Sequence, residues 1–200
     1  MAPVAEPPDS GAAAQDAEPD AYEVARAIAL RSLDAAPRSR HQLGERLARK
    51  GVAPEVAERV LDRFTEVGLL DDVAYARMLV SSRRASRGLA PRALALELRR
   101  AGIADDTAAA VLAELEDGPG ETDEELAASL VRKRLRSMRG LDHEVALRRL
   151  VGMLARKGYS PALAARVARE MLRSEGETGH DVTEDRPGVA ERGTPTRGAP

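Results

Sequence analysis

The stretch Leu43-Gly44-Glu45-Arg46-Leu47-Ala48-Arg49-Lys50-Gly51-Val52-Ala53-Pro54 indicates how this chain is organised. Its two leucines lie four residues apart and therefore share one face of a helix. Basic residues follow them, then a glycine where a helix would end and a proline where the next would begin. A related pattern returns at residues 94–103 and again at 150–161, at offsets of 51 and then 56 residues. A repeat of about 50 residues predicts a row of similar units.

Each repeat is predicted to hold three short helices. About 50 residues bury little apolar surface alone, but three units in a row share interfaces. We therefore expect an all-α fold of three tandem three-helix repeats that form an elongated, curved body. The predicted parts are a disordered acidic tail at 1–20, repeats at 21–68, 69–117 and 121–173, and a second disordered tail at 174–200.

Helix starts carry recognisable capping residues. Asp20, Asp71 and Asp142 are predicted N-caps, with Glu23 completing a capping box after Asp20. Ser39 to Gln42 and Thr122 to Glu125 have the spacing of two further capping boxes. Each of these positions precedes an apolar stripe at helical spacing, which supports the assignment.

Two helix ends can also be estimated. The first helix of the second repeat is predicted to end between Ser82 and Ala85, before a basic stretch that runs into Gly88. The first helix of the third repeat is predicted to be longer and to reach Met138. Its exposed face would include Arg139.

Composition restricts the class of protein. Hydrophobic residues make up 43% of the chain but aromatic residues only 2%, which favours closely packed helices over sheets. The absence of cysteine excludes disulfides and suits a reducing cytoplasm. No apolar run approaches the roughly 20 residues of a membrane helix. The acidic, Pro/Ala-rich N-terminus is unlike a signal peptide, and we expect a cytoplasmic protein.

Catalysis finds little support in the sequence. The three histidines, His41, His143 and His180, have no second ligand at metal spacing. Asp71 and Asp72 are adjacent at a helix start, where they serve better as N-cap and first-turn acid than as a catalytic pair. No glycine-rich phosphate loop is present. We expect a protein that is not an enzyme and needs no metal or cofactor.

Basic residues provide the functional signal. Residues 21–173 hold 28 Lys/Arg against 22 Asp/Glu, whereas both ends of the chain are acidic. Each cluster could be no more than a solvated helix face, but arginine suits planar contacts to phosphate or carboxylate. The candidate binding residues are Arg83, Arg84, Arg87, Arg92, Arg99, Arg100, Arg132, Lys133, Arg134, Arg136, Arg148, Arg149, Arg156 and Lys157.

Three interpretations of these clusters remain open from the residues alone. The chain is a module that binds DNA directly, a partner of a protein–DNA assembly, or a helical scaffold for another protein. Sequence-specific recognition of DNA is disfavoured. The helix after the repeated glycine would have to contact the bases, and in the first two repeats it carries acidic residues that repel DNA. Base stacking is disfavoured as well, since no aromatic residues lie among the arginines.

Three stretches resemble the RecX family. They are Pro37-Arg38-Ser39 with the leucines and Gly51 that follow, Gly68-Leu69-Leu70-Asp71-Asp72 with Tyr75-Ala76-Arg77, and Arg156-Lys157-Gly158-Tyr159-Ser160-Pro161. Together they span roughly residues 22–173 in the family's order and spacing.

The resemblance implies a regulator of the RecA recombinase that is built from tandem three-helix repeats and has no catalytic residues. It implies a protein that lies in the groove of the RecA–DNA filament, blocks its extension or promotes its disassembly, and so damps recombination, DNA repair and the SOS response. The implied partner is the RecA filament, with DNA as a second partner through the basic patches. We expect a monomer that does not bind membranes.

Overall fold

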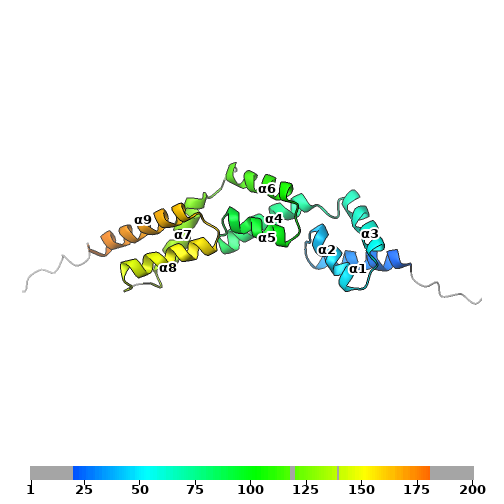
Figure 1. The fold of residues 1–200 in the computed structure, drawn as a ribbon, viewed down its shortest axis with the longest axis horizontal. Coiled ribbons are helices and arrows are strands. Elements are labelled where there is room, and N and C mark those ends of the chain that lie inside the picture. Colours follow the sequence, from blue (N-terminus) through cyan, green and yellow to red (C-terminus); the bar gives the residue numbers. More distant parts are fainter. Residues whose placement is uncertain (1–19, 118–119, 139, 181–200) are drawn as a thin grey trace, which may run out of the picture. The chain divides into compact units, whose positions relative to one another are not determined.

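The computed structural model describes residues 20–117, 120–138 and 140–180. In these ranges the chain is entirely helical apart from turns and short connections, with no strand (Figure 1). The helices are α1 (Ala21–Ala35), α2 (Arg40–Arg49), α3 (Pro54–Glu66), α4 (Asp72–Arg87), α5 (Pro91–Arg100), α6 (Asp105–Asp117), α7 (Asp123–Leu135), α8 (His143–Arg156) and α9 (Pro161–His180). Over the described ranges, none of them has both the length and the apolar character that crossing a membrane requires.

The order of the helices confirms the predicted all-α class with three consecutive groups of three. The predicted disorder at 1–19 and 181–200, and the predicted surface position of Arg139, lie outside the described residues. One boundary is wrong, because α9 continues to His180 and residues 174–180 of the predicted tail are therefore helical.

The chain folds into two compact units. The first contains residues up to Ser81 together with Ala95–Glu114, and the second contains Ser82–Leu94 together with residues from Leu115 onward. The boundary falls inside α4, α5 and α6, so each unit combines one outer repeat with parts of the middle helices.

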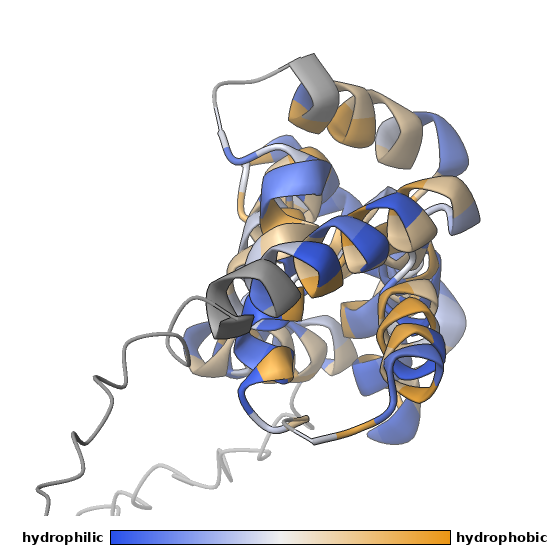
Figure 2. Ribbon diagram, turned by 90° about the vertical axis from the view of Figure 1, so that its left-hand side faces the viewer, coloured by the Kyte–Doolittle hydropathy of each residue, from blue (hydrophilic) through white to orange (hydrophobic). Residues whose placement is uncertain are grey.

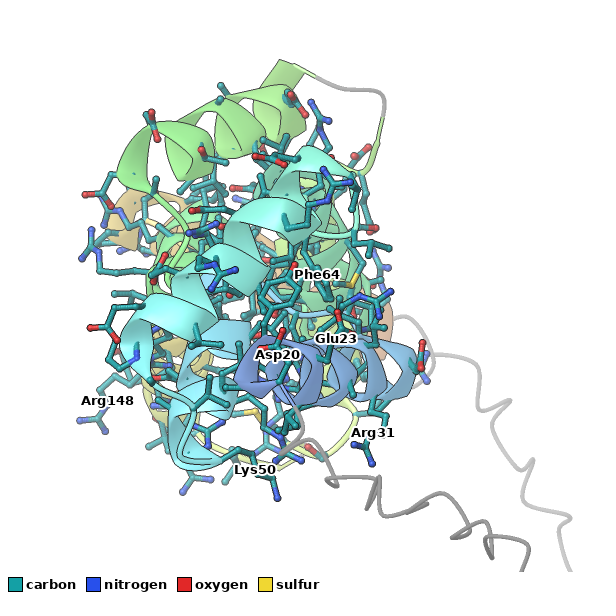
Figure 3. The ribbon with its side chains drawn as sticks, turned by 90° about the vertical axis from the view of Figure 1, so that its right-hand side faces the viewer. Asp20, Glu23, Arg31, Lys50, Phe64 and Arg148 are labelled. Atoms are coloured by element: carbon teal, nitrogen blue, oxygen red, sulfur yellow. The ribbon has the colours of Figure 1, made fainter. Side chains whose placement is uncertain are left out.

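The core of the first unit lies where α1, α2 and α3 pack against one another. Phe64 on α3 points inward among these helices in Figure 3 and is 2% exposed. Leu43 and Leu47, the repeated pair of the first repeat, are fully buried. The other members of this core are Ala25, Ala29, Ala57, Val60, Leu61 and Leu70.

The core of the second unit lies between α7, α8 and α9. Its repeated pair, Leu150 and Leu154, is fully buried, together with Val131 from α7 and Ala164 and Ala168 from α9. Figure 2 shows hydrophobic and hydrophilic segments alternating around individual helices, as expected of helices that bury one face. The helix face that the repeated leucines share is therefore the buried face in both units.

Most predicted caps are confirmed. Capping boxes form at Ser39–Gln42 and at Thr122–Glu125, and the Asp142 carboxylate accepts hydrogen bonds from two N–H groups of α8. Asp20 accepts from the N–H of Tyr22 at the start of α1 (Figure 3). Glu23 differs from the prediction, because its carboxylate pairs with Arg26 at 3.2 Å.

Two helix ends differ from the prediction. The helix predicted to end between Ser82 and Ala85 continues to Arg87, since serine and arginine continue a helix until Gly88 adopts a φ of +60°. Conversely, α7 ends at Leu135, three residues before the predicted Met138. The N–H groups of Ser137 and Met138 bond to carbonyls three residues earlier, which is a tightened turn that leaves Met138 only 6% exposed.

Candidate functional site

A joint between the end of α8 and the start of α5 positions Lys157. The N–H of Ala90 donates to the carbonyl of Lys157 at 2.9 Å, and the Tyr159 hydroxyl donates to the carbonyl of Gly88 at 3.2 Å. A Cβ on Gly158, whose φ is +91°, would lie 2.5 Å from the backbone nitrogen of Ala93. This glycine therefore ends α8 and also allows two backbones to approach closely.

The first unit contains an equivalent joint. The Ser39 hydroxyl donates to the carbonyl of Ala101 at 2.5 Å. A Cβ on Gly102 would overlap the side chain of His41. Ser39 and Ala90 occupy the same position of the repeat, and so do Ala101 and Lys157. In each joint, the C-terminal end of one middle helix therefore packs against the N-terminal end of the middle helix of the preceding repeat.

Lys157 is the centre of the candidate site. Its Nζ donates to the carbonyl of Arg87, the last residue of α4. Burial lowers the pKa of Lys157, and the positive charges of Arg87 and Lys133 lower it further. Among the described residues, none of these three side chains forms an ion pair with a carboxylate. Three cations from α4, α7 and the end of α8 therefore gather at one place.

We call Arg87, Lys133 and Lys157 the basic cluster. Their sequence neighbourhoods form three separate basic stretches, and the fold brings one member of each together. The side chains of Arg87 and Lys133 are exposed, whereas Lys157 is half-buried and held at its tip. Such an arrangement attracts an anion and has already ordered one of its three donors, which lowers the entropic cost of binding.

The other candidate residues are distributed as follows. Exposed side chains of the second unit include Arg92 on α5, Arg132 and Arg134 on α7, Arg136 after α7, and Arg148, Arg149 and Arg156 on α8. Arg99 and Arg100 belong to the first unit and lie within 3.8 Å and 3.6 Å of Asp105 and Glu97, respectively. Arg83 is half-buried.

Arg84 differs from the prediction, which placed it among the residues of the basic binding surface. Its side chain is only 13% exposed, and its guanidinium bonds to the Asp123 carboxylate and to the carbonyl of Glu121, both at 2.6 Å. The side chain therefore fastens the end of α4 to the start of α7. Nothing in the sequence around Arg84 indicates this partner, which lies 39 residues away.

Removal of this clamp is expected to destabilise the protein. The substitution Arg84→Met leaves the half-buried Asp123 carboxylate without its partner, and we expect a loss of about 1–3 kcal/mol in the free energy of unfolding. Urea denaturation followed by circular dichroism measures the effect. Arg77→Met is the matched control, because Arg77 also binds a carboxylate at 2.6 Å but both side chains of that pair are exposed. Equal losses in the two variants would contradict the structural role of Arg84.

Tyr159 makes stability depend on alkaline pH. Burial, aided by the nearby Asp123 charge, raises the pKa of Tyr159 to about 12, whereas the unfolded chain ionises near pH 10. The folded protein then holds its proton more tightly, so stability should fall as the pH rises from about 10 to 12, by up to roughly 2–3 kcal/mol. Lys157, whose pKa is lowered in the folded protein, acts in the opposite direction, and its effect is largely complete by about pH 11.5, one unit above the ordinary lysine value. Urea midpoints between pH 9 and 12 check this slope, which Tyr159→Phe should remove.

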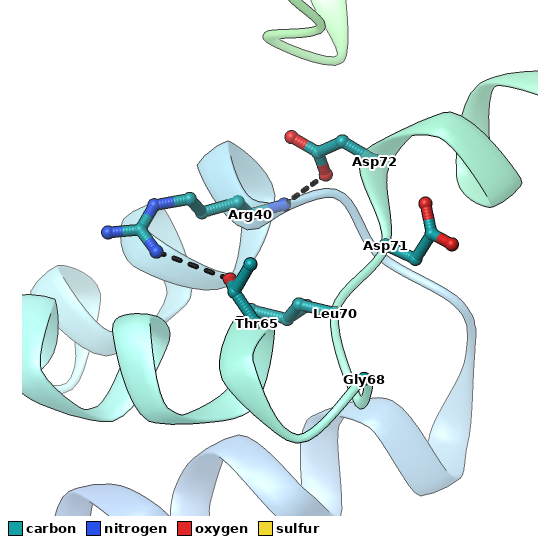
Figure 4. Close-up of a pocket in the computed structure, with 6 residues that line it drawn as sticks. All are labelled: Arg40, Thr65, Gly68, Leu70, Asp71 and Asp72. Atoms are coloured by element: carbon teal, nitrogen blue, oxygen red, sulfur yellow. Dashed lines mark hydrogen bonds between the residues drawn. The ribbon is translucent and has the colours of Figure 1, made fainter.

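The polar side chains around a pocket of the first unit bond to one another and stabilise the fold. Arg40 donates its backbone N–H to Asp72 at 2.8 Å and its guanidinium to Thr65 at 3.4 Å, beside a cavity of about 340 Å³ (Figure 4). The same guanidinium binds Glu58 and Asp62 at 2.6 and 2.7 Å. Burial lowers the pKa of Arg40, but its hydrogen bonds to Asp62 and Glu58 outweigh this effect and raise it.

The adjacent acids at the start of α4 have separate structural tasks. Asp71 caps the helix by accepting the N–H of Ala74 at 2.9 Å, and Asp72 accepts from Arg40. Their predicted roles as N-cap and first-turn acid are confirmed. In the described ranges, no three His, Asp or Glu side chains gather as metal ligands would.

Comparison with known proteins gives a consistent result over the three repeats. The family models for the first, second and third three-helix domains of RecX match residues 25–64, 71–112 and 121–167. The regulatory protein RecX of Thermobifida fusca is 51% identical over 170 residues, which cover 84% of this chain and 88% of that protein. Its counterpart in Streptomyces coelicolor is 49% identical over 170 residues, with 84% and 89% covered.

A solved structure supports the fold independently. The crystal structure of RecX from Lactobacillus salivarius superposes with a TM-score of 0.66 at 19% identity and covers 76% of this chain and 97% of that one. At that identity the likeness concerns the fold alone. The three domain matches and the closely similar relatives show that this chain belongs to the RecX family.

Proposed function

We propose that this protein is a negative modulator of RecA. It binds the RecA–DNA filament as a monomer, prevents its extension, and thereby lowers ATP hydrolysis and strand exchange. Its role would be to restrain recombination, DNA repair and the SOS response. The relatives named regulatory protein RecX support a regulatory role, and the basic cluster is the observation that carries the proposed mode of binding.

The basic cluster suits a polyanionic partner. A RecA–DNA filament contains a continuous row of DNA phosphates, and cations that neutralise phosphates gain free energy by releasing counterions. The joint sets Lys157 beside the end of α4, and Arg87 and Lys133 remain exposed around it. The exposed arginines of α7 and α8 would extend this basic surface along the filament.

Occupancy alone would account for inhibition. A protein bound at the growing end of a filament blocks the protomer interface that the next subunit needs. No bond is made or broken in this mechanism, so it needs neither a catalytic residue nor a cofactor.

ATP hydrolysis by RecA on single-stranded DNA tests the proposal. Substoichiometric amounts of this protein should slow hydrolysis progressively as filaments shorten. Hydrolysis that is unchanged at every ratio of the two proteins would refute it. A matched preparation heated to unfolding controls for effects of the buffer.

Direct binding to DNA is the second candidate, favoured by the same three cations of the basic cluster. In that case the protein would retain DNA on a filter without RecA, with an affinity that falls steeply with salt, by about one unit of logarithmic slope per phosphate contacted. A scaffold for another protein would retain neither DNA nor filaments. Filter binding with and without RecA separates the three possibilities.

A further inference from the structure

An apolar groove lies on the first unit next to its polar pocket, with which it shares Gly68 and Asp71. Its volume is about 360 Å³, which is at the small end of the range for ligand sites in proteins. Leu33 lines it from α1 and Pro37 from the connection that follows α1. Leu69 lines it from the turn before α4, and Tyr75 and Met78 from α4 itself. The groove therefore combines surfaces of two consecutive repeats within one unit.

The fold holds Leu69 outside the core. The N–H groups of Leu69 and Leu70 both bond to the carbonyl of Phe64, at 2.8 and 3.1 Å, which ties the turn to the end of α3. Leu70 fills the core and is 3% exposed, whereas Leu69 is 51% exposed. Met78, which also lines the groove, is 41% exposed. Apolar side chains held in water around a hollow are typical of a surface that binds a protein.

Most polar side chains that line the groove already have hydrogen-bond partners, but the guanidinium of Arg38 keeps donors available. The Tyr75 hydroxyl donates to Gln42 at 3.1 Å, and Asp71 caps α4. Arg38 donates only from Nε, to the carbonyl of Ser32 at 3.4 Å, and within the described part of the chain its two terminal nitrogens bond to nothing. A guanidinium with both terminal nitrogens available matches a carboxylate.

We propose that this groove binds an acidic segment of a protein partner, which inserts an aliphatic side chain between Leu69 and Met78 and presents a carboxylate to Arg38. The inference rests on the proposed function, since it makes the protein component of the filament the partner. A DNA backbone could satisfy Arg38 but would leave the apolar walls uncovered. The N-terminal residues 1–19 of the chain itself are acidic, but they contain only Met1 and Val4 as large apolar side chains.

Neutral substitutions test the groove without changing the charge. Leu69→Gln and Met78→Gln should each weaken binding to RecA filaments on single-stranded DNA, with roughly a tenfold loss of affinity, because burial of an aliphatic side chain is forfeited. The loss should be the same at low and moderate salt, since the contact is apolar. Val24→Gln is the matched control, as Val24 is also 41% exposed but lies outside the groove, and it should bind within about twofold of wild type.

The outcomes separate the groove from the proposed function. If wild type binds filaments and Leu69→Gln binds equally well, the groove proposal is wrong and the proposed function stands. If wild type binds no filament, the proposed function itself fails. If Leu69→Gln weakens binding to DNA equally in the absence of RecA, the groove binds DNA and the protein partner is wrong. If sedimentation shows that the wild type is a dimer which Leu69→Gln dissociates, the groove binds a second copy of the chain and the protein partner is again wrong. Thermal unfolding should be unchanged in all three variants.

Discussion

Gly158→Ala should destabilise the second unit by roughly 2–5 kcal/mol, whereas Gly51→Ala should cost only about 1–2 kcal/mol. Both glycines follow the middle helix of a repeat and both have positive φ, +91° and +78°. An alanine at either position is strained by the left-handed conformation. Only at Gly158 would the new Cβ also overlap a backbone, that of Ala93, because nothing lies within 4 Å of the corresponding point at Gly51.

Comparing the two variants separates the cost of the close contact between Gly158 and Ala93 from the cost of placing alanine in a left-handed conformation. Urea denaturation of both variants, followed by circular dichroism, gives the two losses under one set of conditions. An equal loss would mean that the approach of Gly158 to Ala93 can relax without cost, and that the joint is not tightly packed. Gly102→Ala extends the test to the first unit, where the new Cβ would overlap His41.

The double charge reversal Arg87→Glu/Lys133→Glu should weaken inhibition of RecA by about a hundredfold at low salt. Two cations become two anions, and the logarithmic dependence of filament affinity on salt should fall by about two units if both side chains contact phosphates. Lys157 is left intact because its Nζ also holds the end of α4. The measurement is the concentration of protein that halves RecA-dependent ATP hydrolysis, determined at several salt concentrations.

A second reversal controls for net charge. Arg31→Glu/Lys50→Glu changes the charge by the same amount, and both side chains project outward from the first unit (Figure 3). This variant should lose little inhibition beyond a general electrostatic effect. If the two double variants lose inhibition equally, the overall charge governs binding and the basic cluster has no special place in it.

Local chemistry made the helices and their caps predictable. A capping box such as Ser39–Gln42 needs residues only three apart, so its chemistry is complete within one helical turn. The buried pairs Leu43/Leu47 and Leu150/Leu154 were predictable for the same reason, since helical periodicity places them on one face. The end of α4 was not, because serine and arginine tolerate both helix and turn, and only Gly88 decides where the helix stops.

The sequence predicted which basic residues are candidates for the site, but not how they are arranged. Arg84 and Arg87 lie in one basic stretch, yet Arg84 is tied to Asp123 and Arg87 is exposed. Their difference depends on which side chain reaches Asp123 at the start of α7, and no local pattern indicates that. The groove around Leu69 escaped prediction in the same way, since adjacent leucines at 69 and 70 look alike until the turn directs one inward and one outward.

The helices, their caps and the glycines that end them could be inferred from the amino-acid sequence, because each of these depends on residues within one or two helical turns. The repeat could be inferred as well, because the same short pattern recurs along the chain. Tertiary packing was needed to establish that Gly158 meets Ala93, that Arg84 is used as a clamp, and that Arg87, Lys133 and Lys157 converge. Those contacts join residues 24 to 70 positions apart in the chain. They depend on how the repeats pack, and packing is set by the whole shape of each buried face rather than by any short stretch.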